Sequence, residues 1–448
     1  MKFFRDNSEL MTQGSIRKKI ILFAIPIFIG QLFQQLYNTV DSLIVGNLIG
    51  KNALAAVSST GTLTFLVIGF FFGFSMGAGV VIAREIGAEN EKKISDAVHS
   101  AVAMGLLFSV AITALGVGFS PMMLRLMGTP EEVMGDAVLY LRVYFCGCTG
   151  LIMYNTFVGI LQASGDSRHP LIYLIISSMT NVVLDIFFIA VLKMGVDGAA
   201  LATVLSQVLS MVLALIRLKR HGGVIRLHFG KIRLERRTMK EIVHFGFPTA
   251  IQGSIIDIAN LMIQSYVNSF GSLAMAGIGA YSRIEGFAFL PVISFSMAMS
   301  TFISQNMGAG KKERMRKGIR FGLGCTMVTI EIIGVLIFFL SPLLIKAFNA
   351  EPDVIYYGVL RAQICSLFYF LLGFSNVTSA VMRGLGKPMA PMLVMIVCWC
   401  AVRVAVLLTI GQVYHNILLT CWIYPITWGL SSVAYLIYFI RLHKQNVF

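Results

Sequence analysis

The chain has 448 residues, of which 57% are hydrophobic and only 13% are charged, and its formal net charge is +15. Soluble domains carry ~45–50% apolar and ~25% charged residues. The composition therefore excludes an ordinary soluble enzyme, a disordered chain and a secreted disulfide-rich domain, and it predicts an all-α polytopic membrane protein. The basic residues lie in short loops between apolar segments, without interleaved aromatic residues, so no nucleic-acid partner is expected.

Apolar segments long enough to cross a ~30 Å hydrocarbon layer recur about twelve times along the chain. The expected transmembrane helices cover residues 20–45, 53–82, 97–119, 134–161, 170–192, 196–216, 242–269, 274–304, 321–341, 354–382, 389–410 and 418–440. The longest polar connection lies between the sixth and seventh. We therefore expect an N-terminal six-helix bundle over 1–219, a cytoplasmic linker over 220–240 and a C-terminal six-helix bundle over 241–448.

The distribution of basic residues predicts the orientation. With these spans, 28 of the 36 Lys and Arg residues fall on one side of the membrane and four fall on the other. Because cytoplasmic loops carry an excess of Lys and Arg, this bias predicts that both termini and the 220–240 linker are cytoplasmic. We expect a multi-pass protein of the cytoplasmic (inner) membrane.

Short motifs recur at a constant offset of 221 residues. The pairs are Phe74-Ser75-Met76 with Phe295-Ser296-Met297, Gly87-Ala88 with Gly308-Ala309, Ser120-Pro121 with Ser341-Pro342, and Gly165 and Pro170 with Gly386 and Pro391. Six spans separate the two copies, so both copies have the same orientation and the repeat is parallel. Such duplications build transporters whose substrate site lies between the halves.

The first span carries a polar face. Its members recur at intervals of three or four residues and are Gln31, Gln34, Asn38 and Asp41. Tyr37 lies one turn before Asp41. Polar side chains within a span are expected to face the protein interior or water. Pro26 lies upstream, where it removes a backbone hydrogen bond and allows a kink.

The fourth, fifth and sixth spans add further oxygen-bearing side chains. Asn181 and Asp185 are one helical turn apart, Thr203 belongs to a polar face of the sixth span, and Asn155 lies in the fourth. With Asp41 they offer the oxygen ligands that Na⁺ requires, and two close carboxylates can share a proton. Hydrogen bonding between helices explains a lone Asn or Thr, but it explains two intramembrane aspartates poorly.

The second half is less clearly patterned. Asp257 in the seventh span is expected either to contact substrate or to be paired structurally. Arg283 and Glu285 are two apart in the eighth span and so do not face each other, and a structural ion pair with a residue elsewhere is the favoured interpretation for them. Glu331 and Arg403 have no role that the pattern indicates.

The most specific motifs are Pro26 followed by Gln34-Gln35-Leu36-Tyr37-Asn38-Thr39-Val40-Asp41 and Gly46, and Asn181-Val182-Val183-Leu184-Asp185. With twelve spans and a parallel repeat, they resemble the DinF-like prokaryotic branch of the multidrug and toxic compound extrusion (MATE) family. The resemblance covers nearly the whole chain. It implies two six-helix bundles and export of organic cations in exchange for Na⁺ or H⁺. Asp257 departs from this branch, because the norfloxacin-exporter branch carries an acid in that span, and this leaves open which half binds the ion.

The resemblance also implies roles for individual residues. Asp41, Asn181, Asp185 and Thr203 would form the proton or Na⁺ site, and Pro26 would be the hinge of the first helix. We add Tyr37 to the ion site because it is one turn from Asp41. Gln34, Asn38, Asn155 and Asp257 are candidates for contacts with substrate in the cavity.

The sequence thus predicts a cation-coupled antiporter that exports amphipathic, cationic small molecules by alternating access, and a monomer in the bilayer. No nucleotide, metal-protease or nucleophile motif appears in context, so neither enzymatic activity nor a cofactor is expected beyond the coupling ion. A flippase of a lipid-linked anionic precursor is the alternative, for which Arg142, Arg283, Arg361 and Arg403 are possible phosphate contacts. A channel or receptor has less support, because no selectivity-filter motif is present.

Overall fold

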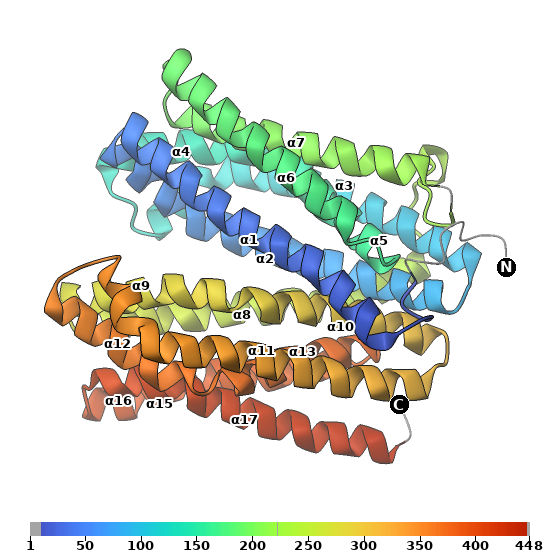
Figure 1. Cartoon of the computed structure of the whole chain (residues 1–448). Helices are drawn as coiled ribbons and strands as arrows, with labels where there is room; N and C mark the ends of the chain where they lie inside the picture. Colours follow the sequence, from blue (N-terminus) through green and yellow to red (C-terminus); the bar gives the residue numbers. More distant parts are fainter. Residues whose placement is uncertain (1–9, 222, 446–448) are drawn as a thin grey trace. The chain divides into compact units, whose positions relative to one another are not determined.

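The computed structural model describes residues 10–221 and 223–445, and for several residues between 51 and 68 it describes the backbone alone. The chain termini, whose side of the membrane is predicted above, lie outside the described residues. Helices and short turns make up the described part, and no strand occurs in it. Figure 1 shows the helices in chain order. The all-α fold predicted from composition is confirmed.

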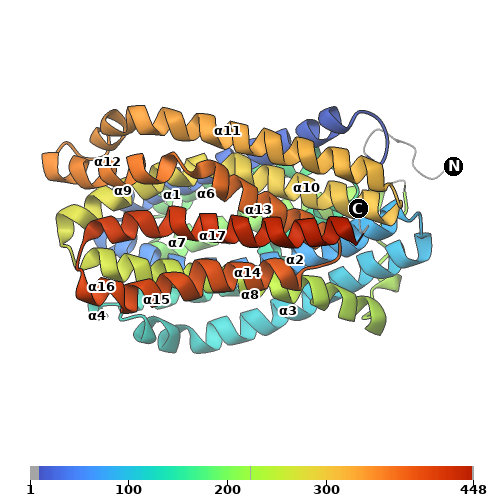
Figure 2. The same cartoon turned by 90° about the horizontal axis from the view of Figure 1, so that it is seen from below.

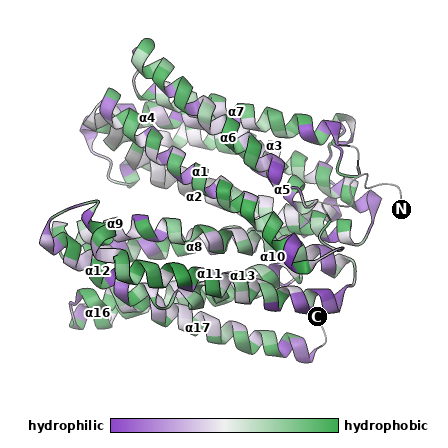
Figure 3. Ribbon diagram, in the orientation of Figure 1, coloured by the Kyte–Doolittle hydropathy of each residue, from purple (hydrophilic) through white to green (hydrophobic). Residues whose placement is uncertain are grey.

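Among the described residues, ten helices are long and apolar enough to cross a membrane, and two bent pairs raise the number to twelve if each pair is one span. The bent pairs are α4–α5, with an angle of 47°, and α12–α13, with an angle of 57°. These twelve elements correspond one by one to the segments expected from the sequence. Hydrophobic residues make up most of the length of α11, with hydrophilic residues toward its N-terminal end (Figure 3).

The chain divides into two compact units that are not contiguous in sequence. Unit 1 comprises residues 1–10 and 29–250, and unit 2 comprises residues 11–28 and 251–448. This division differs from the bundles expected over 1–219 and 241–448. The start of the first helix joins unit 2, and the expected linker over 220–240 joins unit 1.

Unit 1 contains the C-terminal part of the first helix, all of the next six and the N-terminal part of α8. The elements are α1 (Ile16–Leu48), α2 (Lys51–Gly87), α3 (Glu91–Leu126), α4 (Glu131–Cys146), α5 (Cys148–Ala163), α6 (Arg168–Asp185), the π-helical turn η1 (Ile186–Val191), α7 (Val196–Arg220), the 3₁₀ turn η2 (Phe229–Lys231) and α8 (Arg236–Asn268). The expected linker packs on this unit because Ile225 and Leu227 are buried in a core cluster with residues of α2, α3 and α5.

Unit 2 contains the rest of α8 and all later helices. They are α9 (Ser272–Ala288), α10 (Leu290–Gly308), α11 (Lys312–Lys346), α12 (Pro352–Ser366), α13 (Tyr369–Gly384), α14 (Met389–Met395), the π-helical turn η3 (Ile396–Ala401), α15 (Val402–Leu408), α16 (Ile410–Val413) and α17 (Ile417–Lys444). Within this unit α14 and α17 run side by side (Figure 2).

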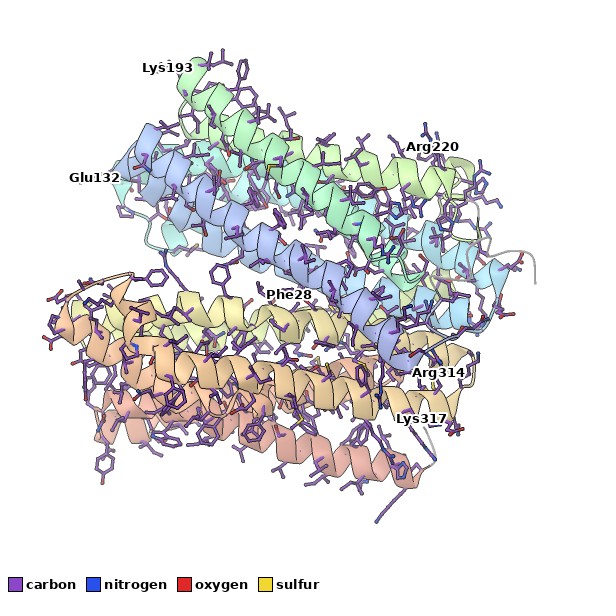
Figure 4. The ribbon with its side chains drawn as sticks, viewed as in Figure 1. Phe28, Glu132, Lys193, Arg220, Arg314 and Lys317 are labelled. Atoms are coloured by element: carbon purple, nitrogen blue, oxygen red, sulfur yellow. The ribbon has the colours of Figure 1, made fainter. Side chains whose placement is uncertain are left out.

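The segment before α1 belongs to unit 2 because polar groups hold it there. The backbone N–H of Met11 donates to Gln305 Oε1 at 2.8 Å. The guanidinium of Arg314, which Figure 4 labels, donates to the carbonyl oxygens of Met11, Gln13 and Gly14. Ile20 and Phe23 of the first turns of α1 are then buried in a core cluster of the same unit.

The two divisions that fall inside helices each come just after a proline. In α1 the division follows Phe28, two residues after Pro26, and in α8 it follows Ala250, two residues after Pro248. A proline within a helix lacks the N–H that would bond the carbonyl four residues earlier, and its ring displaces that carbonyl. Pro248 was not singled out from the sequence, although it occupies the position in the second half that Pro26 occupies in the first.

Candidate functional site

The carboxyl groups of Asp41 on α1 and Asp185 on α6 lie within hydrogen-bonding range of each other inside unit 1. Asp185 is fully buried, and Asp41 is half-buried. One oxygen of each group, Oδ1 in both residues, is buried without a hydrogen-bond partner among the described residues. The structure therefore brings together the two aspartates that the sequence placed on separate polar faces.

Asn181 and Thr203 surround the buried end of this carboxyl pair. With its amide oriented to satisfy both neighbours, Asn181 donates to Asp185 Oδ2 at 3.0 Å and accepts from the backbone N–H of Thr203 at 3.2 Å. The spacing of Asn181 and Asp185 by one turn of α6 makes the first contact possible. Asn181 thus connects α6 to α7 and holds one carboxylate oxygen in place.

Tyrosine hydroxyls complete the polar cluster. The Tyr37 hydroxyl lies within hydrogen-bonding range of the Thr203 hydroxyl, which donates to the carbonyl oxygen of Ala199 at 3.1 Å. Tyr140 and Tyr144, one turn apart on α4, lie near this group with stacked rings whose centroids are 6.3 Å apart. Neither tyrosine was predicted from the sequence to belong to the site. Their spacing of four within the fourth span is the signal that would have found them.

The geometry of the cluster determines what it can bind. Two adjacent carboxylates repel one another in a low-dielectric interior, and a shared proton or a small monovalent cation removes this repulsion. The unpartnered Oδ1 atoms of Asp41 and Asp185 supply two anionic oxygens for such a cation. The residues therefore fit either a proton or Na⁺.

Helix irregularity coincides with this site. The α-helical part of the fifth span ends at Asp185, and the π-helical turn η1 follows directly. Such turns interrupt the regular hydrogen-bond ladder and occur frequently at functional positions. The fifth span of the second half also contains a π-helical turn, η3, and no Asp or Glu precedes or follows it directly in the sequence.

The remaining predicted residues do not join the cluster. Asn155 donates to the carbonyl oxygen of Leu151 on its own helix at 2.9 Å. Asn38 is exposed, and Gln34 is half-buried. Asp257 lies in unit 2, half-buried, and has no hydrogen bond or ion pair within the described ranges 10–221 and 223–445.

The structural ion pairs expected for Arg283 and Glu285 with residues elsewhere are not found among the described residues. Arg283 is exposed and has no ion-pair partner in the part of the chain that the structure describes, whereas Glu285 is buried. The two side chains point to different faces of the helix, as expected for residues two apart. Glu285 instead accepts a 3.0 Å hydrogen bond from Tyr281, whose hydroxyl also contacts that of Tyr369 at 2.8 Å.

Two arginines lie buried near Glu285 in unit 2. The guanidinium groups of Arg361 and Arg403 stack on the ring of Tyr424, at 4.6 and 4.3 Å from its centroid. Arg403 also donates to Thr427 Oγ1 at 3.1 Å. The buried charge is thus stabilised by cation–π contacts and by the nearby carboxylate of Glu285. Arg403, which had no role at the level of sequence, belongs to this cluster.

Comparisons with known proteins identify the family. The MatE family model matches residues 26–187 and again residues 248–409, in agreement with the expected repeat. The chain is 27% identical to the probable multidrug resistance protein YoeA of Bacillus subtilis, with 98% of this chain and 96% of the relative covered. It is 29% identical to the probable multidrug resistance protein NorM of Thermotoga maritima, with 91% and 88% covered.

A solved structure shows the same fold. An outward-facing multidrug resistance MATE transporter of the MOP superfamily matches with a TM-score of 0.91 at 23% identity, covering 98% of this chain and 99% of that chain. Two matches of one family model cover more than half of the sequence, and the helices of both halves are long and apolar enough to cross a membrane. The chain is therefore a multi-pass membrane protein that belongs to the MatE family of transporters.

Proposed function

We propose that this chain is a cation-coupled antiporter that exports amphipathic organic cations through the cytoplasmic membrane by alternating access, with H⁺ or Na⁺ as the coupling ion. The observation that carries the proposal is the carboxyl pair of Asp41 and Asp185. Relatives over nearly the whole chain bear the names of multidrug resistance proteins, which supports the substrate class. The transporter acts as a monomer with both termini in the cytoplasm, and it has no enzymatic activity.

Coupling follows from the different charge states of the pair. A proton or Na⁺ that enters from outside neutralises one carboxylate and removes the repulsion between Asp41 and Asp185. The packing of α1 around Tyr37 and Thr203 then changes, and Pro26 absorbs the bend. To change the population ratio of two conformations from 1:99 to 99:1, the ion must bind one conformation ~5.5 kcal/mol more tightly than the other. Two close, buried carboxyls provide that difference more readily than one exposed group.

The flippase alternative has no separate support from the arginines. Arg142 and Arg283 are exposed, whereas Arg361 and Arg403 are buried against Tyr424. A phosphate-binding cavity within the membrane needs cationic groups that the ligand can reach. Two of these four side chains are exposed and the other two are packed in a core, so they do not form such a group.

The test is transport in reconstituted vesicles with an imposed pH gradient or an imposed Na⁺ gradient and a fluorescent organic cation as substrate. Wild-type protein is expected to drive uphill transport with at least one gradient. Asp41→Asn and Asp185→Asn are expected to abolish it while retaining folding and insertion. Asp257→Asn is the matched control, because it removes the same charge from a span in unit 2. It is expected to leave coupling intact and to alter substrate affinity or range.

Either of two results contradicts this assignment. If Asp41→Asn transports normally and Asp257→Asn does not, the ion site lies in unit 2. If no gradient drives organic-cation transport by the wild-type protein, the proposed activity itself is wrong.

A further inference from the structure

A polar pocket of about 810 Å³ lies in unit 1 between the first turns of α3 and the connection that follows α7. Small-molecule pockets have volumes of ~300–1,000 Å³, so this one is large enough for a charged headgroup or metabolite. Most of its lining belongs to residues 223–233, outside the membrane-spanning helices. The residues whose charge matters are Glu91, Lys92, Asp96, Arg226, Lys231 and Arg233.

The pocket carries an excess of positive charge. Its lining includes four basic residues and two acidic ones. Arg233 pairs with Asp96 at 3.2 Å. Lys92, Arg226 and Lys231 have no ion-pair partner within residues 10–221 and 223–445. Three cationic groups with a single unpaired carboxylate therefore surround a solvent-accessible space.

Alternating burial fixes the basic side chains on the pocket side. Ile225 and Leu227 are buried in the core of unit 1, and the residues between and after them, Arg226 and His228, are exposed. The backbone N–H of Leu227 donates to the carbonyl oxygen of Leu218 at 3.2 Å. The backbone of this segment is thus held in register and does not need to be ordered when a ligand binds.

A buried histidine anchors the same segment to α3. His99 is 2% exposed, and its Nδ1 lies 2.6 Å from the carbonyl oxygen of Ser95, an acceptor only. Nδ1 therefore carries the hydrogen, and Nε2 accepts the backbone N–H of His228 at 3.1 Å. Ser100 adds a second anchor, since its hydroxyl donates to the carbonyl oxygen of Arg233 at 3.2 Å.

We propose that this pocket binds a phosphate group through Lys92, Arg226 and Lys231. Lysine and arginine together are the usual donors to phosphate, because the guanidinium donates two parallel hydrogen bonds and the ammonium supplies a compact charge. A phosphate group also matches the excess positive charge of the lining. The group is carried either by an anionic phospholipid headgroup or by a soluble phosphate compound. This site is separate from the transport site proposed above, and it does not depend on that function.

The test uses the purified full-length protein in an uncharged detergent. One arm adds inorganic phosphate at constant ionic strength, and the other adds phosphatidylglycerol, with phosphatidylcholine as the neutral reference. Thermal stabilisation against ligand concentration yields an affinity in each arm. The variant Lys92→Ala/Arg226→Ala/Lys231→Ala removes the pocket cations. The matched control Arg236→Ala/Lys240→Ala/Arg320→Ala removes three exposed cations that do not line the pocket.

The pocket variant is expected to bind at least about tenfold more weakly than wild type, since one charge-assisted hydrogen bond contributes about that factor. The control variant should bind as wild type does, and both variants should melt near the wild-type temperature without ligand. A response to phosphatidylglycerol alone assigns the phosphate to a lipid headgroup, and a response to inorganic phosphate assigns it to a soluble ligand. Equal affinity of the two triple variants, or no response in either arm, overturns the proposal.

Discussion

The backbone N–H of Phe370 donates a 2.9 Å hydrogen bond to Glu331 Oε2. Phe370 is the second residue of α13, which follows the 57° bend that separates it from α12. The first N–H groups of a helix have no partner within the helix, and the membrane interior offers no water to replace it. Glu331, for which the sequence indicated no role, therefore caps a helix that begins inside a span.

We expect Glu331→Ala to destabilise the protein, because the N–H of Phe370 loses its partner. The cost of a buried unsatisfied donor is ~1–3 kcal/mol. Glu331→Gln retains an acceptor oxygen and should lose less. Thermal unfolding of both variants in detergent checks the order, and equal melting temperatures for wild type and Glu331→Ala would exclude the cap.

A second prediction concerns Asn181. Replacement by Ala removes the donor to Asp185 Oδ2 and the acceptor for the N–H of Thr203. We expect a loss of ~1–3 kcal/mol in stability together with weaker ion coupling. Asn155→Ala is the matched control, since Asn155 bonds only a carbonyl of its own helix. If vesicle transport and unfolding respond equally to both substitutions, Asn181 has no special role in the site.

The two prolines near the divisions between units are expected to act as a pair. Pro26→Ala and Pro248→Ala each restore an N–H to a helix that belongs partly to each unit, which favours a straight helix. We expect the transport rate to fall several-fold in both variants. Pro342→Ala should leave the rate unchanged, because α11 lies entirely within unit 2. Similar transport rates for all three variants would show that α1 and α8 do not bend at these prolines during transport.

The charge bias predicts which ends of unit 1 face the cytoplasm. Lys193 precedes α7 and Arg220 ends it, so they lie at opposite ends of that helix (Figure 4). A membrane-impermeant maleimide should label Lys193→Cys in intact cells. Labelling of Lys231→Cys should require disrupted cells. The reverse pattern would invert the predicted topology.

We expect the free energy of unfolding to fall at low pH because of His221, which lies just beyond α7. Burial and the neighbouring charge of Arg217 lower the pKa of His221, and its Nδ1 accepts the backbone N–H of Gly223 at 3.1 Å. The unfolded chain, with a histidine pKa of ~6.5, therefore binds more protons than the folded chain below that pH. The stabilising contribution is present above pH ~6.5 and is lost as the pH falls through the lower folded-state pKa.

The free energy of unfolding, measured between pH 8 and pH 5, checks this sign. His221→Gln should lose less stability than wild type on acidification, because its side chain does not titrate. A steeper loss in the variant than in the wild type would contradict the assignment to His221.

The sequence by itself determined the number and placement of the spans, the duplication and the polar faces that carry Asp41 and Asp185. These features depend on hydropathy and on helical periodicity, which are properties of neighbouring residues. The same periodicity would have indicated the Tyr140–Tyr144 pair. The expectation that Arg283 forms a structural ion pair with a residue elsewhere was wrong, because its side chain is exposed and has no acidic partner among the described residues.

Only the tertiary structure decided which of these faces meet. Asp41 contacts Asp185, and Phe370 bonds Glu331, although the two members of each pair lie far apart in sequence. The division of the chain after Pro26 and Pro248 also depends on contacts between distant segments. So does the basic pocket, whose histidine anchor on α3 bonds a connection more than a hundred residues later. Packing between distant helices sets such contacts, and no local pattern encodes them.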